Sequence, residues 1–125
     1  MKAVQCVRYG SPDVLRLVDV PQPTPKDNEV LIRVQATAAT PSDVAFRSGQ
    51  PFLTRFFSGL LRPKYIPGTE LAGEVAAVGR AVTKFRPGDP VVGASGTKFG
   101  AYAEYICLPE DGLIARRPAN MSAAE

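Results

Sequence analysis

Short runs of alternating apolar and polar residues dominate this chain, and prolines and glycines separate them. In the strongest run, residues 30–39, the side chains of Val30, Ile32 and Val34 share one face. Alternation of this kind predicts half-buried β-strands. Further strands are predicted over residues 3–8, 15–20, 70–78, 82–85, 91–93, 101–107 and 112–116. Because 12 prolines and 11 glycines punctuate these runs, the pattern predicts a mainly β barrel or sandwich.

The hydrophobic period changes in the middle of the chain. Thr40 followed by Pro41 is typical of a helix start, with Thr40 as the N-cap, and this helix is expected to end at Gly49. A second helix is predicted over residues 52–61. Three of its apolar side chains recur at a spacing of four and are predicted to be buried: Phe52, Phe56 and Leu60.

The length of 125 residues fits one domain, and such a domain needs no metal or disulfide to form a core. Its last residues, Ser122 to Glu125, match the capping box that opens a helix. A helix that starts where the chain stops indicates a fragment of a longer protein. The alternative interpretation is a frayed terminal tail.

Histidine is absent, which removes the commonest general base and the commonest metal ligand. The two cysteines, Cys6 and Cys107, are too distant in sequence to suggest a ligand pair or a disulfide framework. The first eight residues contain no apolar segment typical of a signal peptide, so none is expected, and no apolar run reaches membrane-spanning length. We therefore expect a soluble cytoplasmic protein without metal and without a membrane partner.

The net charge of +3 is mild, but basic and aromatic residues alternate in one region. Its basic residues are Arg47, Arg55, Arg62 and Lys64. Interleaving of this kind can bind single-stranded nucleic acid. Because the phenylalanines recur at helical spacing, we interpret them instead as a core stripe backed by solvated charges, and no nucleic-acid partner is expected.

No motif within the chain supplies a complete site. The segment 93–98 lacks the spacing of a phosphate-binding P-loop, and the dinucleotide fingerprint Gly-x-Gly-x-x-Gly is absent. A Ser-His-Asp arrangement is impossible without histidine. The carboxylates Asp43, Glu70 and Asp89 each stand in a turn or at a strand start, where a structural role explains them. The residues alone therefore predict a β-rich domain with no self-contained catalytic site.

Two segments carry a family resemblance: residues 67–93, which begin Pro-Gly-Thr-Glu-Leu-Ala-Gly, and residues 36–49. In this order and spacing they resemble the N-terminal GroES-like domain of the medium-chain dehydrogenase/reductase superfamily, over nearly the whole chain. The resemblance implies a partly open β-barrel with one or two short inserted helices over residues 1–125. It also implies a Rossmann cofactor domain after residue 125 and a homodimer at full length.

The resemblance further points to one branch of the superfamily. In the zinc alcohol dehydrogenases a cysteine stands at the place of Thr40 and a histidine at the place of Thr69. Neutral hydroxyls are poor zinc ligands, and the four-cysteine structural-zinc lobe is missing too. The chain looks like the zinc-independent quinone oxidoreductases. The implied cofactor is NADP or NAD, and the implied substrate is a quinone or an α,β-unsaturated carbonyl compound (an enone).

The same resemblance places specific residues at the reaction cleft. Thr40 and Ser42 are expected to face the nicotinamide and the substrate and to be the catalytic residues, although each has a rival role as a helix cap. Thr69 and Glu70 are expected to line the floor of the cleft, with Glu70 more structural than catalytic. Tyr65 is expected to border the substrate pocket.

The alternative function is a stand-alone GroES-like module that binds or assembles with a partner protein through residues 52–61. The two interpretations differ in one observable property. A binding module is expected to leave Phe56 and Phe57 exposed as one apolar patch.

Overall fold

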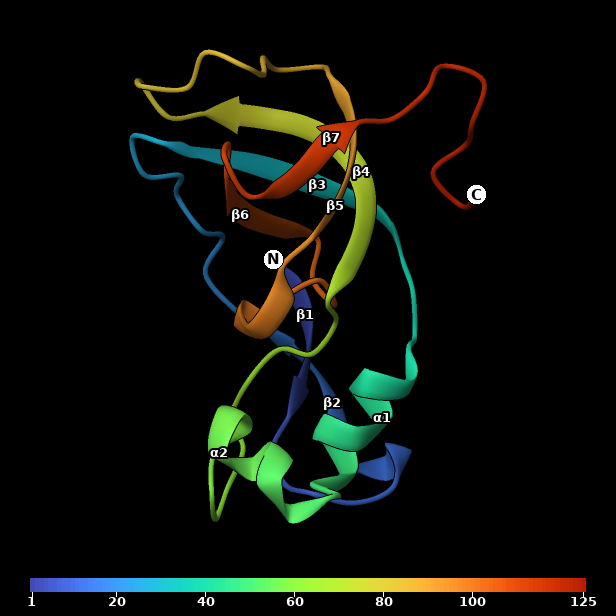
Figure 1. The fold of residues 1–125 in the computed structure, drawn as a ribbon. Coiled ribbons are helices and arrows are strands. Elements are labelled where there is room, and N and C mark those ends of the chain that lie inside the picture. Colours follow the sequence, from blue (N-terminus) through green and yellow to red (C-terminus); the bar gives the residue numbers. More distant parts are fainter.

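Seven strands form two antiparallel sheets in the computed structural model, which describes residues 1–125 (Figure 1). The first two strands pair as a separate ribbon, with Ala3 opposite Val18. The other five form a curled sheet in the order β6-β3-β4-β5-β7. The strands are β1 (Lys2–Cys6), β2 (Leu15–Asp19), β3 (Glu29–Thr37), β4 (Glu70–Val78), β5 (Pro90–Ala94), β6 (Tyr105–Pro109) and β7 (Leu113–Arg116).

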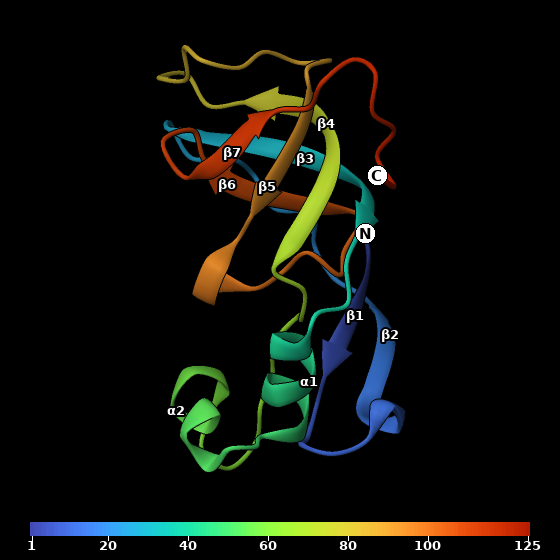
Figure 2. The same cartoon turned by 45° about the vertical axis from the view of Figure 1, so that its right-hand side comes forward.

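All helices except η3 (Gly96–Lys98), which directly follows β5, lie together at the end of the molecule away from the larger sheet (Figures 1 and 2). The longest is α1 (Pro41–Ser48), which follows β3 and ends at Gly49 as predicted. The others are single turns: η1 (Pro12–Val14), η2 (Phe52–Thr54), α2 (Arg55–Ser58) and η3 (Gly96–Lys98). No helix is long and apolar enough to cross a bilayer. The mainly β fold with short inserted helices confirms the fold class predicted from the sequence.

The core lies inside the curl of the five-stranded sheet. Val30 and Ile32 from β3 meet Val75 from β4 and Val91 from β5, and all four side chains are fully buried or nearly so. Leu31, between Val30 and Ile32, is buried as well, so β3 shows the alternation predicted from the sequence only from Ile32 onward. Phe85 is buried against the same cluster from the loop after β4.

The sheet curls because the central pair, β3 and β4, is irregular. Their register shifts twice, between Leu31 and Ile32 and between Val34 and Ala36, and such bulges bend a strand. Gly73 lies opposite Val34 in this bend. A Cβ atom on Gly73 would lie 2.2 Å from the carbonyl oxygen of Arg33, so only glycine allows this approach.

Two predicted strands differ from those observed. Residues 82–85 form a loop, because the Glu110 carboxylate accepts hydrogen bonds from the backbone N–H groups of Thr83 and Lys84, both at 3.0 Å. These donors therefore need no strand partner. Residues 101–104 are also outside any strand, and only an isolated bridge joins Ala103 to β1. The observed strand β6 begins at Tyr105.

The predicted helix over residues 52–61 is wrong in length and in burial. Gly59, at φ +113°, follows α2 after a single turn, so no continuous helical stripe forms. The three side chains predicted to be buried are 60%, 63% and 48% exposed, in the order Phe52, Phe56 and Leu60. The segment is held instead by Arg55, whose guanidinium lies over the rings of Tyr9 and Phe52.

The C-terminal capping pattern forms only in part. The backbone N–H of Ser122 donates to the Glu125 carboxylate at 2.7 Å, and this bond lowers the pKa of Glu125. Residues 122–125 form a turn, and no helix is present among them.

The close approach at Gly73 makes a stability prediction. We expect Gly73→Ala to lower the free energy of unfolding by about 2–3 kcal/mol, because the added methyl group would push β3 away from β4. Gly88→Ala is the control: Gly88 has φ +94° but open space around it, so the cost is about 1 kcal/mol of backbone strain. Urea unfolding followed by circular dichroism measures both. Equal losses would contradict the steric account.

Candidate functional site

The N-terminus of α1 carries the first part of the site. Thr40 has extended backbone angles (φ −108°, ψ 161°) and caps the helix as predicted. Its hydroxyl accepts from the backbone N–H of Asp43, while the Asp43 carboxylate accepts from the backbone N–H of Thr40 at 2.8 Å. This reciprocal pair is a capping box with aspartate at its third position.

The hydroxyl of Thr40 also links Ser42 to Asp43. It lies 2.7 Å from the Ser42 hydroxyl and donates to the Asp43 carboxylate at 2.8 Å. Ser42 is exposed, Thr40 is half-buried, and Asp43 is only 7% exposed. Because the Thr40 hydrogen is committed to Asp43, Thr40 is left to accept from Ser42. The chain of bonds thus runs from solvent to a buried carboxylate and fixes the direction of both hydroxyls.

Asp43 has one carboxylate oxygen, Oδ1, that is buried without a hydrogen-bond partner. Tyr102 approaches this carboxylate, and burial together with the Asp43 charge raises the pKa of the Tyr102 phenol. The Tyr102 hydroxyl donates to the carbonyl oxygen of Ala38 at 3.3 Å. A cavity of 420 Å³ lies here, and Asp43, Arg47 and Tyr102 supply its polar groups. A buried oxygen with a free lone pair gives this end of α1 an unused acceptor.

The second part of the site is the turn that leads into β4. Gly68 has φ +91°, and a Cβ atom there would lie 2.4 Å from the ring of Tyr102. Its carbonyl oxygen and that of Thr69 accept from Ser95, whose backbone N–H lies 2.7 Å from the Thr69 oxygen. Glu70 begins β4 and is exposed, and its carbonyl oxygen accepts from the Thr37 hydroxyl at 2.6 Å.

Tyr65 lies in a different environment from the other four predicted residues. Its ring packs on Phe99 with centroids 4.9 Å apart, and its hydroxyl is buried without a hydrogen-bond partner. Burial is the main cause that raises the pKa of Tyr65, so the phenol keeps its proton. The neighbouring Cys6 thiol adds to this shift. The backbone carbonyl oxygen of Tyr65 accepts from the Cys6 N–H at 2.9 Å, and this bond ties Tyr65 to β1.

The predicted site residues therefore form three groups. Thr40 and Ser42 are bonded to each other, and Thr69 and Glu70 are consecutive on a turn held by Ser95. Tyr65 is in the aromatic cluster, and no hydrogen bond joins the three groups. The pairing of Thr37 with Leu71 still brings the end of β3 and the start of β4 together. The functional roles of these residues remain predictions.

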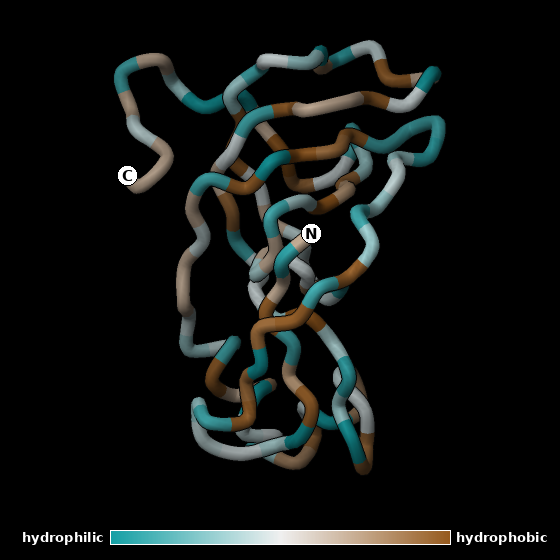
Figure 3. Tube along the Cα trace, turned by 180° about the vertical axis from the view of Figure 1, so that it is seen from behind, coloured by the Kyte–Doolittle hydropathy of each residue, from teal (hydrophilic) through white to brown (hydrophobic).

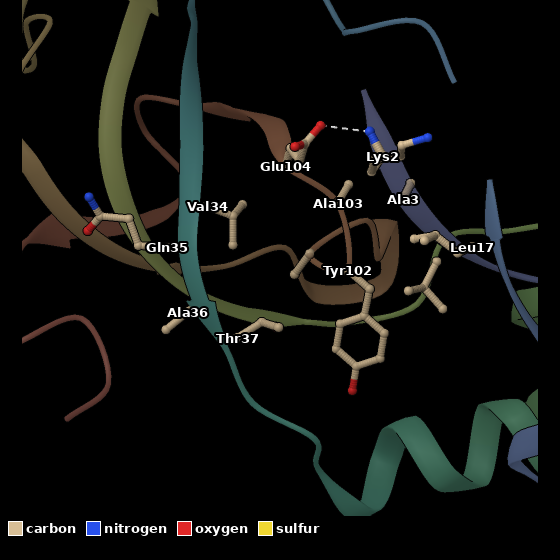
Figure 4. A pocket seen from close by; sticks show the side chains of 12 residues that line it. Lys2, Ala3, Leu17, Val34, Gln35, Ala36, Thr37, Tyr102, Ala103 and Glu104 are labelled. Carbon is tan, nitrogen blue, oxygen red and sulfur yellow. Dashed lines mark hydrogen bonds between the residues drawn. The ribbon is translucent and has the colours of Figure 1, made fainter. Parts of the chain in front are cut away.

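Sequence reasoning missed Tyr102 and Ser95, which hold the parts of the site in place. Figure 4 shows Tyr102 projecting from a groove of 540 Å³ between β1 and β3, with its hydroxyl directed toward α1. At the other end of the groove, the backbone N–H of Lys2 donates to the Glu104 carboxylate at 2.7 Å. The alternation over residues 101–107 placed Tyr102 on one face but gave no sign of its partners.

Neither cysteine is an activated nucleophile. Burial raises the pKa of the Cys6 thiol, which donates to the carbonyl oxygen of Arg8. Burial, with the nearby Glu29 charge, raises the pKa of Cys107 to about 11. No three histidine, cysteine or acidic side chains gather where they would hold a metal ion.

Comparison with known proteins locates the chain in one family. The family model described as "Alcohol dehydrogenase GroES-like domain" matches residues 26–118. The chloroplastic quinone-oxidoreductase homolog of Spinacia oleracea is 40% identical over 129 residues, covering 100% of this chain and 37% of that protein. The quinone oxidoreductase of Sus scrofa is 43% identical over 112 residues, covering 89% of this chain and 32% of that protein.

Solved structures agree with these relatives. The quinone oxidoreductase from Coxiella burnetii superposes with a TM-score of 0.89 at 34% identity, covering 99% of this chain and 39% of that one. The Escherichia coli quinone oxidoreductase complexed with NADPH superposes with a TM-score of 0.84 at 29% identity, covering 98% of this chain and 35% of that one. The chain thus spans between about a third and two-fifths of the length of these proteins.

The capping role of Thr40 predicts how substitutions change stability. Thr40→Ala removes the side-chain acceptor for the Asp43 N–H, and we expect it to cost about 1 kcal/mol of unfolding free energy. Thr40→Asn restores an N-cap acceptor and is expected to stay within about 0.5 kcal/mol of the parent chain. Thermal unfolding measures the difference. If the two variants were equally stable, the box would contribute nothing.

The raised pKa of Cys107 predicts slow alkylation with a steep pH dependence. At pH 8 about one molecule in a thousand carries the thiolate, because the pKa of about 11 lies three units higher. Iodoacetamide labelling, followed by mass spectrometry, should rise about tenfold per pH unit from pH 7 to 9.5 without a plateau. A plateau near pH 8.5, as in free cysteine, would contradict the burial account.

Proposed function

Because this chain belongs to the family of alcohol dehydrogenase GroES-like domains, we propose that it is the substrate-side domain of a zinc-independent, NAD(P)H-dependent oxidoreductase. The reaction passes hydride to a quinone or an α,β-unsaturated carbonyl compound. The names of the relatives, which are quinone oxidoreductases, support this substrate class. In this proposal the active protein is longer than residues 1–125, cytoplasmic and a homodimer.

The hydroxyl chain from Ser42 through Thr40 to Asp43 carries the proposal. Thr40 stands where the zinc-dependent branch has cysteine, and its hydroxyl is already committed to Ser42 and Asp43. A neutral hydroxyl in such a network does not fit zinc, and the chain has no histidine to complete a site. We derive no step through a metal. Carbonyl polarisation falls instead to hydrogen-bond donors.

The chemistry of a conjugated carbonyl suits these donors. A nicotinamide bound beside Thr40 and Ser42 would supply a hydride to the conjugated carbon of the acceptor, and negative charge would then develop on its carbonyl oxygen. Before the substrate binds, the Ser42 hydroxyl donates to Thr40, whose own hydrogen is held by the buried Asp43, and this keeps the Ser42 oxygen at the N-terminus of α1. Because Ser42 has one hydrogen, its hydroxyl then turns from Thr40 to the carbonyl oxygen and donates to it as negative charge develops there. The oxygen finally takes a proton from solvent.

Only the nicotinamide end of the cofactor finds suitable groups on this chain. The hydroxyls of Thr40 and Ser42 suit the polar nicotinamide, but no Gly-x-Gly-x-x-Gly turn is present for the phosphates. One structural relative is a complex with NADPH, in which this domain accounts for 35% of the chain. We therefore assign the phosphates of NADP or NAD to a Rossmann domain beyond residue 125.

A second candidate function, the stand-alone binding module, is supported by one observation. Phe56 and Phe57 are each 63% exposed, which is the outcome that this alternative predicted. Exposure alone does not exclude the enzyme, because the relatives contain about twice as much additional chain to cover such residues.

The native reading frame past Glu125 is the first test. We expect a continuing helix and then a strand that ends in a glycine-rich turn. The longer protein should oxidise NADPH with a quinone or an enone but not reduce NADP with a primary alcohol, and a chelator should not change the rate. A stop after residue 125, or turnover by residues 1–125 alone, would overturn the proposal.

Substitution in α1 tests the residue roles. In the longer protein, Ser42→Ala should lower kcat by about 100-fold, because it removes a donor to the developing oxyanion. Ser48→Ala, in the last turn of the same helix, removes only a bond to the Ala45 carbonyl and should retain the parent rate. Equal kcat values for both variants would assign Ser42 a structural role only.

A further inference from the structure

An unusual share of the apolar surface comes from one short segment. Twelve large hydrophobic side chains are exposed in the whole chain, and half of them lie within ten consecutive residues. We call these six the 52–61 surface: Phe52, Leu53, Phe56, Phe57, Leu60 and Leu61. Leu61 is 90% exposed, the highest value among them. A patch of this kind marks an interaction site rather than ordinary scattered exposure.

The charged residues of the sequence interval that contains this surface have a single sign. No acidic residue occurs between Asp43 and Glu70, and the four basic residues of that interval remain uncompensated: Arg47, Arg55, Arg62 and Lys64. The five ion pairs of the structure use none of them. Arg62 and Lys64 are exposed and follow the 52–61 surface directly. An apolar surface followed by two exposed cations is suited to an anionic partner.

The 52–61 surface rests on a folded base. Besides its contacts with Tyr9 and Phe52, Arg55 donates to the carbonyl oxygen of Gly49 at 3.2 Å. Phe57 meets Phe46 of α1 edge to face, with centroids 6.4 Å apart. Arg55 is therefore held within the protein, and Arg62 and Lys64 carry the free charge. Presentation on an ordered base reduces the entropy cost of binding.

The surface lies at one extremity of the molecule. Figures 1 and 2 both show α2 at the end opposite the five-stranded sheet and the C-terminus. In Figure 3 apolar and polar segments alternate along this end. It can therefore approach an extended flat surface without interference from the sheet.

We propose that the 52–61 surface docks on an anionic lipid membrane. The phenylalanine and leucine side chains enter the boundary between headgroups and acyl chains, while Arg62 and Lys64 contact lipid phosphates. A second copy of the chain is a poorer occupant, because a symmetric interface would set these four cations against the same four. The sequence predicted no membrane partner because no apolar run is long enough to span a bilayer, but a surface that docks on a membrane needs no such run.

Vesicle sedimentation tests the apolar contribution. Residues 1–125 should bind phosphatidylcholine vesicles that contain phosphatidylserine, and bind pure phosphatidylcholine at least about tenfold more weakly. Phe56→Ser with Phe57→Ser should lower binding by about tenfold or more. Leu17→Ser with Leu113→Ser, both 71% exposed and on β2 and β7, is the matched control and should bind like the parent.

Charge reversal provides a second variant pair. Arg62→Glu with Lys64→Glu should reduce binding to the anionic vesicles by about tenfold or more, and added salt should reduce binding by the parent chain. Arg86→Glu with Lys98→Glu changes the net charge equally at exposed positions outside the segment. This control variant should lose much less of its binding to the anionic vesicles. Equal losses in both pairs would mean that overall charge, and not this surface, binds the lipid.

Tryptophan fluorescence locates the contact. The chain has no tryptophan, so Leu61→Trp introduces a single probe on the surface and Leu113→Trp one on the sheet. With anionic vesicles, the emission maximum of the Leu61→Trp variant should shift to the blue, and that of the Leu113→Trp variant should not. The proposal is overturned if neither shifts, if the parent chain forms a dimer that Phe56→Ser disrupts, or if oligonucleotides bind this surface instead. It is also overturned if a longer protein containing this chain does not bind.

The outcome is independent of the proposed function. Vesicle binding needs no cofactor or turnover, so a chain without reductase activity can still bind, and an active reductase can fail to bind. The two proposals therefore fail separately.

Discussion

The pairing of β3 with β4 is the constraint on which the rest of the structure depends. These two nine-residue strands lie at the centre of the sheet, and both register shifts of the larger sheet occur between them. The contact between Gly73 and the Arg33 carbonyl lets the backbones approach closely enough for the bend to form. Because the bend closes the sheet around Val30, Ile32 and Val75, the core and the curvature have one cause.

The same pairing assembles the candidate site. Thr37 lies opposite Leu71, so the chain leaves β3 toward α1 at the place where it enters β4 from the Gly68 turn. Tyr102 fills the space between these two connections, near Asp43 on one side and against Gly68 on the other. Residues about thirty positions apart in sequence therefore reach one end of the sheet through the pairing of β3 with β4, and the Thr37 hydroxyl supports it by donating to the Glu70 carbonyl.

Sequence predicted well where the signal is local. Alternation placed the inward face of β3, and Thr40 with Pro41 marked the start of α1, because both patterns reflect the period and the donors of one element. It failed over residues 52–61, since a helical spacing shows which side chains share a face but not whether anything covers them. It missed Tyr102 and Ser95 because their partners, Ala38 and Thr69, come from distant segments.

The two ends of α1 connect the candidate site with the 52–61 surface. Thr40 and Ser42 stand at its N-terminus, while Phe46 near its C-terminus packs against Phe57. Eight helical residues span only about 12 Å, so one rigid element separates the two. Quinones with long apolar tails partition into lipid, where a purely aqueous enzyme meets them rarely. If the proposed docking and the proposed substrate class are both correct, a surface one short helix away from the hydroxyl chain would give such a quinone a path from the membrane that avoids crossing water.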